Sequence, residues 1–110
     1  MQDKSVNHMP DPSEFLEAAE TFQYLGDSKR LSILWILCHQ EECVQQIAAT
    51  VQMSEPAVSY HLRILKQHGL IRSRREGKEV YYTLENDKKA SLVHQMIDDY
   101  FELDCMNKRE

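Results

Sequence analysis

The sequence of 110 residues lacks long apolar runs, a disulfide framework and internal repeats. No apolar stretch approaches the roughly 20 residues that a helix needs to span a bilayer. No charged-then-apolar signal segment opens the chain. Three cysteines are an odd number and too sparse for a small disulfide scaffold, which favours a reducing compartment with free thiols. We therefore expect one cytoplasmic domain with no membrane partner.

A net positive charge is also absent, but the net charge of −5 is distributed unevenly. Residues 1–53 carry three basic and eight acidic side chains, and residues 82–110 carry four and seven. Residues 54–81 carry six basic and three acidic side chains, a local excess of +3. A basic segment in an acidic chain is typical of a sequence-specific DNA-binding protein with limited phosphate contact. Its affinity for DNA should depend strongly on salt.

Apolar spacing and capping residues predict four helices before residue 69. The first runs from Asp11-Pro12 to Gly26, the second from Asp27 or Ser28 to about residue 40, the third is short and spans Val44 to Val51, and the fourth begins at Ser54 after a turn at residues 52–54. The fourth helix should bury Val58, Leu62 and Leu65 and end before Gly69. Residues 70–75 and 80–84 alternate around residues 76–79, which predicts a β-hairpin. This order is the plan of a winged helix-turn-helix, in which the fourth helix is the recognition helix and the hairpin is the wing.

Candidate DNA-binding residues lie on the recognition helix and the wing. The helix N-terminus suits a phosphate, its polar side chains can reach base edges, and wing cations can contact phosphates or enter a minor groove. The predicted set is Ser54, Ala57, Ser59, Tyr60, His61, Arg63, Lys66, Arg72, Arg74, Arg75 and Lys78. An alternative interpretation is a winged helix used only for protein contact, with these residues as solvated surface charges.

The last helix, capped by Asn86 or Asp87, has an apolar stripe too broad for a monomer of this size to cover. Its members are Leu92, Val93, Met96, Ile97, Tyr100, Phe101 and Leu103. We expect a homodimer through the first and last helices. The predicted fold class is mainly α with a β-hairpin wing, in the order α-α-α-α-β-β-α, with a mobile arm at residues 1–11, the winged domain at 12–104 and a tail at 105–110.

Three segments closely resemble the ArsR/SmtB family of bacterial winged-helix repressors: residues 25–34, the helix-turn-helix with residues 58–62, and residues 77–84. The resemblance covers about residues 14–104. It implies a homodimer that occupies double-stranded operator DNA near its own promoter and releases it when an inducer binds. The inducers of that family include zinc, cadmium, arsenite, other metals and oxidised sulfur species, so the resemblance leaves the signal open.

The position of Cys43 matches the first thiolate of the family branch that binds soft metals at the start of the third helix. That branch has a second cysteine where this chain has Gln45. Because soft-metal sites need three or four S and N donors, His39, Cys43 and Cys105 are the candidate ligands. Such a site would couple the DNA-binding unit to the dimer helix. The expected inducer is zinc, cadmium or another thiophilic metal, with no organic cofactor.

Other sensing sites fit the sequence less well. The zinc-sensing branch has an Asp-x-His pair where this chain has Asn86 and Lys88. His94, Asp98 and Glu102 lie at i, i+4 and i+8 and could chelate zinc in another arrangement, although we favour a solvated helix face.

The remaining alternatives involve the cysteines. Cys43 and Cys105 could form a regulatory disulfide if their Cα atoms lie within about 7 Å. Cys38 lies on an apolar stripe and is expected to be a core residue. His39 and Cys43 could pair as base and nucleophile, but no third orienting group accompanies them, so we do not expect an enzyme.

Overall fold

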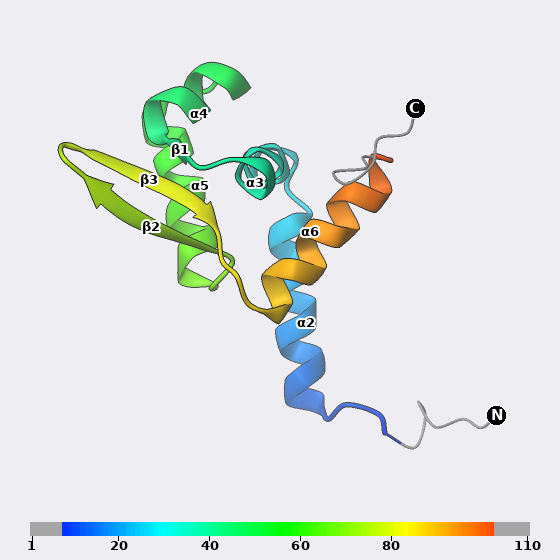
Figure 1. The fold of residues 1–110 in the computed structure, drawn as a ribbon. Helices are drawn as coiled ribbons and strands as arrows, with labels where there is room; N and C mark the ends of the chain where they lie inside the picture. The colour runs from blue at the N-terminus through cyan, green and yellow to red at the C-terminus, as the bar shows by residue number, and fades with distance from the viewer. Residues whose placement is uncertain (1–7, 103–110) are drawn as a thin grey trace.

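The computed structural model describes residues 8–102, which form five helices and one three-stranded antiparallel sheet (Figure 1). The elements are α2 (Pro12–Leu25), α3 (Ser28–His39), β1 (Glu42–Cys43), α4 (Val44–Val51), α5 (Glu55–Gln67), β2 (Ile71–Glu76), β3 (Glu79–Leu84) and α6 (Lys88–Tyr100). The predicted helices and hairpin are confirmed, and so is the winged helix-turn-helix fold. β1 was not predicted, because two residues are too few to show an alternating pattern.

The predicted capping residues begin their helices for the expected chemical reason. Asp11 accepts from the backbone N–H of Glu14, whose side chain accepts from the N–H of Asp11, which is a capping box. Asp27 accepts from the N–H groups of Lys29 and Arg30 at the start of α3. These bonds satisfy amides that have no partner within the helix.

The core lies where α3, α4, α5 and α6 meet the base of the hairpin. Its largest fully buried side chains are Ile33, Leu34, Leu37, Ile47, Val58, Leu62, Leu65, Leu70 and Ile71. The predicted inner face of the recognition helix, Val58, Leu62 and Leu65, is therefore confirmed. Gly69, next to the C-cap residue of α5, has a φ of +74°, which glycine adopts without a steric penalty.

The wing is β2 paired with β3 from Ile71 opposite Leu84 to Glu76 opposite Glu79. Gly77 at its tip has a φ of +65°, as a tight hairpin turn requires. β1 pairs with the other edge of β3, so the sheet order is β1-β3-β2. Figure 1 shows the hairpin projecting away from α2 and α6.

The apolar stripe of α6 divides into two halves. Val93 and Ile97 are buried in the core, whereas Leu92, Met96 and Tyr100 are exposed. None of the residues of α2 is buried. The exposed apolar side chains of both helices therefore remain uncovered in the single chain. Leu103, the arm residues 1–7 and the tail lie outside the described residues.

Candidate nucleic-acid interface and metal ligands

The outer face of α5 carries Ser59, Tyr60, Arg63 and Lys66, all of which are exposed as predicted. The Arg63 guanidinium lies 5.7 Å from the centre of the Tyr60 ring, a cation–π arrangement that limits the freedom of both side chains. Lys66 donates from Nζ to Oγ of Ser73 at 2.7 Å, which ties the helix to the wing. This face is polar and basic, and its side chains make few contacts with the rest of the chain.

The N-terminus of α5 is capped by Ser54, whose Oγ accepts from the N–H of Ala57 at 3.2 Å. Ser54 is exposed, whereas Ala57 is half-buried. The remaining first-turn amides and the helix dipole give this end a partial positive charge. Such an end can accept a phosphate group.

His61 departs from the sequence-based expectation, because the structure buries it to 7% exposure. Its Nδ1 lies 3.4 Å from Nη1 of Arg30, and burial lowers the pKa of the imidazole. Arg30 and Lys29 lower that pKa further, whereas Asp27 raises it. His61 therefore packs the inner side of α5 against the start of α3. It does not lie on the face that could reach a base.

The wing arginines differ in how they are held. Arg74 donates to both carboxylate oxygens of Glu41 at 2.8 Å and also to Glu76. Its hydrogen bonds to these two carboxylates raise the pKa of Arg74 above its ordinary value, and the same contact lowers the pKa of Glu41. Arg72 pairs with Glu85 at 3.2 Å. Arg72 and Arg74 are therefore each paired with a carboxylate of the same chain.

Arg75 and Lys78 are the exposed wing cations without such partners. Among the described residues, neither side chain makes an ion pair or hydrogen bond. Arg75 lies opposite Val80 in the hairpin, and Lys78 lies at its tip. Both are available to an anionic partner.

The described cysteines occupy different environments. Cys43 is 8% exposed and is the N-cap residue of α4, where its side chain makes no capping hydrogen bond. Cys38 is half-buried and packs against the core, as the apolar pattern predicted. Cys105 lies outside the described residues, so neither the predicted ligand set of His39, Cys43 and Cys105 nor the Cys43–Cys105 disulfide can be followed in the structure.

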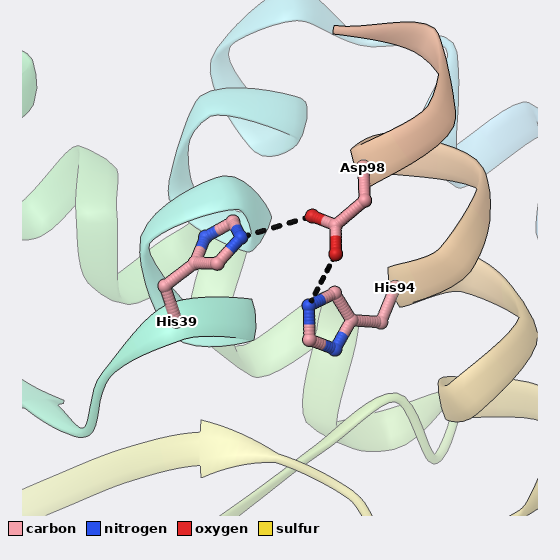
Figure 2. Close-up of side chains that lie close together, drawn as sticks. All are labelled: His39, His94 and Asp98. Atoms are coloured by element: carbon pink, nitrogen blue, oxygen red, sulfur yellow. Dashed lines mark hydrogen bonds and ion pairs between the residues drawn. The ribbon is translucent and has the colours of Figure 1, made fainter. Parts of the chain in front are cut away.

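His39 has a different neighbour from the one that the sequence suggested. Its Nε2 lies 3.0 Å from Oδ1 of Asp98, and Nε2 of His94 lies 3.1 Å from Oδ2 of the same carboxylate (Figure 2). Within residues 8–102, this is the group of three whose donor atoms are mutually close enough to hold a metal ion, and Cys43 is not a member of it. The four-residue spacing of His94 and Asp98 was visible in the sequence, but their contact with α3 was not.

No helix within residues 8–102 has the length and apolar content to cross a membrane. Comparison with known proteins agrees with the fold. Residues 27–73 match the family described as "Bacterial regulatory protein, arsR family".

A curated relative, the "Transcriptional repressor SmtB homolog" of Synechocystis, is 40% identical over 88 residues, which are 80% of this chain and 67% of the relative. The "Cadmium resistance transcriptional regulatory protein CadC homolog" of Staphylococcus aureus is 36% identical and covers 73% of this chain and 67% of its own length. These relatives are regulators rather than enzymes.

Among solved structures, a homodimeric winged helix-turn-helix DNA-binding domain of Mycobacterium bovis superimposes with a TM-score of 0.71 and 25% identity. The superposition covers 92% of this chain and 88% of that one. That domain is described as belonging to a possible ArsR-family transcriptional regulator. Sequence and structure thus lead to the same assignment: the chain belongs to the arsR family of bacterial regulatory proteins.

Proposed function

We propose that the protein is a homodimeric transcriptional repressor that binds operator DNA and releases it when a metal ion binds. The observation that carries the proposal is the exposed face of α5, which presents Ser59, Tyr60 and Arg63 beside a wing with uncommitted cations. A major groove admits one α-helix, and arginine is the side chain most often used to recognise guanine there.

Each part of this surface has a separate role. Arg63 and the hydroxyl groups of Ser59 and Tyr60 would contact base edges, which gives sequence preference. Arg75 and Lys78 would contact phosphates, which gives affinity and orientation. His61 is left out of the contact set because it is buried.

The homodimer is supported by the exposed apolar face that α2 and α6 share. Phe22, Leu92 and Met96 line a groove between these helices, and exposed fractions of 61%, 59% and 42% are high for large apolar side chains. A second copy of the chain would cover this face. The homodimeric state of the similar Mycobacterium bovis domain supports the same assembly.

A metal ion is supported as the signal by the relatives whose names refer to cadmium resistance. The chain also offers nitrogen, oxygen and sulfur donors within its fold. Oxidation of Cys43 has less support, because a buried thiol is shielded from oxidants. Contact with an acidic protein instead of DNA would use the same wing.

The DNA-binding part is tested with the full chain and a duplex from upstream of its own coding region, by fluorescence anisotropy. Arg63→Ala should weaken binding at least about fivefold, since a lost bidentate base contact costs about 1–3 kcal/mol. Lys29→Ala is the matched control, because it removes one exposed positive charge from α3, outside the recognition helix, the wing and the α2–α6 groove. An absence of binding at every salt concentration would favour the protein-contact interpretation.

The dimer is tested by sedimentation velocity. Leu92→Glu places a charge in the exposed apolar groove and should give monomers. Ser91→Glu, at the adjacent exposed position of α6, should leave the dimer intact. The assigned interface would be contradicted if both variants were monomers to the same extent, or if both remained dimers.

A further inference from the structure

The end of α3 faces the middle of α6 through three side chains that carry metal-binding atoms. His39 is the last residue of α3, and His94 and Asp98 lie one turn apart on α6. Figure 2 shows both imidazole rings directed at the Asp98 carboxylate. One nitrogen from each ring and one carboxylate oxygen lie within 4.8 Å of one another.

The hydrogen bonds of His39 leave its Nε2 atom suited to a cation. Nδ1 lies 2.6 Å from the carbonyl oxygen of Trp35. A carbonyl oxygen only accepts, so Nδ1 carries the proton and donates. In the neutral ring, Nε2 then has a lone pair that points at Oδ1 of Asp98, 3.0 Å away. Two acceptors at this distance repel unless the ring takes a second proton or a cation lies between them.

His94 approaches the other oxygen of the same carboxylate. Its Nε2 is 3.1 Å from Oδ2 of Asp98, but the buried nitrogen has no hydrogen-bond partner among the described residues. A buried polar atom without a partner lowers stability by roughly 1–3 kcal/mol. A metal ion would give this atom a bonding partner.

We propose that His39, His94 and Asp98 bind one divalent transition-metal ion of the zinc type. Two imidazole nitrogens and a carboxylate oxygen suit Zn(II), Co(II) or Ni(II) better than thiophilic ions. Ligands about 2.0–2.1 Å from a tetrahedral ion lie roughly 3.3–3.4 Å apart. The nitrogen–oxygen separations here are 3.0 Å from His39 to Oδ1 and 3.1 Å from His94 to Oδ2, so small shifts of the side chains would bring both nitrogens and one oxygen to that spacing. Water occupies the fourth position, as in other sites with three protein ligands.

The hydrogen bond from His39 to Trp35 is itself typical of a metal-binding histidine. Such residues commonly donate their second N–H to a backbone carbonyl, which fixes the ring and the tautomer. This donor set also differs from the thiolate set that the sequence suggested. His39 belongs to both sets, so His94 and Cys43 are the residues whose substitution distinguishes them.

Metal binding at this cluster would fix α6, which carries the exposed apolar face, against α3, which packs on the helix-turn-helix. The bound ion would thus favour one arrangement of the dimer helix relative to the recognition helix. Release of the operator by this route rests on the proposed function, whereas the metal site does not.

Metal affinity is measured on the full chain after removal of metals with a chelator. Co(II) is followed by its visible absorption, whose intensity identifies a four-coordinate site, and Zn(II) by competition with a chromogenic chelator. Trp35, the single tryptophan, has its ring centre 4.6 Å from that of His39, so its emission should change with occupancy.

His94→Gln and His39→Gln should each lower the affinity for Zn(II) at least about tenfold and remove the Trp35 response. His68→Gln is the matched control, since His68 stacks on Tyr24 away from the cluster and its loss should leave affinity unchanged. Cys43→Ser should also bind normally. Circular dichroism verifies that each variant is folded.

The proposal is overturned if Zn(II) affinity survives both cluster substitutions, or if Cys43→Ser abolishes it. In that case, the three side chains form only imidazolium–carboxylate ion pairs. Operator binding is measured separately: His94→Gln should bind DNA without metal and keep it when Zn(II) is added. Normal metal binding without any DNA binding would overturn the proposed function and leave the site standing.

Discussion

Arg74 and Arg75 are neighbours on β2, but the structure predicts that they contribute unequally to DNA binding. Arg74 is held by Glu41 and Glu76, so its charge is already balanced within the chain. Arg75 is exposed and makes no ion pair or hydrogen bond to residues 8–102. Substitution of each by alanine removes the same side chain from adjacent positions of one strand. The two variants therefore compare an arginine paired within the chain with an unpaired one, on opposite faces of the same strand.

The expected difference follows from counterion release. Each neutralised phosphate contributes about 0.9 to the slope of log affinity against log salt concentration, and a dimer presents each wing residue twice. Arg75→Ala should make the slope shallower by about 1.8. The Kd of Arg75→Ala divided by the Kd of the wild type should therefore be about 12-fold smaller at about 200 mM salt than at about 50 mM salt. Arg74→Ala should change the slope by less than about 0.5, since it releases few counterions.

Anisotropy titrations of one labelled operator duplex at four or five salt concentrations give both slopes. Lys29→Ala reports the effect of losing an exposed positive charge outside the wing and the α2–α6 groove. A slope for Arg74→Ala as shallow as that of Arg75→Ala would refute the reasoning, because the internal carboxylates would then not retain Arg74. An unchanged slope for Arg75→Ala would exclude the wing tip from phosphate contact.

Three further predictions concern stability, each measured as the free energy of unfolding in urea at fixed protein concentration. Leu62→Ala should lower it by about 2–5 kcal/mol, because Leu62 is 1% exposed and its removal leaves a cavity in the core; a loss below about 1 kcal/mol would contradict this packing. Asp27→Ala should lower it by about 1 kcal/mol through loss of the cap on α3, and Asp27→Asn should lose less. Burial lowers the pKa of His61, so wild-type stability is complete above about pH 6.5 and falls as the pH drops toward the folded-state pKa. His61→Gln should lose less stability than the wild type between about pH 7.5 and pH 5.5, and an equal loss would assign the acid sensitivity to other groups.

Local chemistry explains why the fold was predictable from the sequence. Asp11, Asp27 and Ser54 supply caps that act within three residues, and Gly69 and Gly77 have the positive φ angles that end a helix and turn a hairpin. These signals depend on neighbours in sequence rather than on the tertiary structure. The helical spacing of apolar residues likewise specified the buried face of α5.

The candidate sites were less predictable because they depend on contacts between distant residues. His39 and Asp98 are 59 positions apart, so nothing near His39 in the sequence indicates its partner. His61 is a different case: it lies three residues after Val58 and four before Leu65, so helical spacing already placed it on the buried face, and the expectation of an exposed histidine followed its residue type instead. Which wing arginine is paired within the chain also depends on Glu41, which is 33 positions from Arg74 in the sequence.

Residues 39–43, at the end of α3 and in its connection to α4, contact α6, the wing and α4. His39, the last residue of α3, contacts α6 through Asp98, and Glu41 holds the wing through Arg74. Cys43 then pairs in β1 with Tyr81 of β3 and caps α4, the first helix of the helix-turn-helix. Since these contacts lie within five consecutive residues, a change in the position of His39 must be absorbed by the wing, by α4 or by both. Under the proposed function, a ligand at the α3–α6 contact would act on the DNA-binding unit through a short covalent path, without a long chain of side-chain contacts.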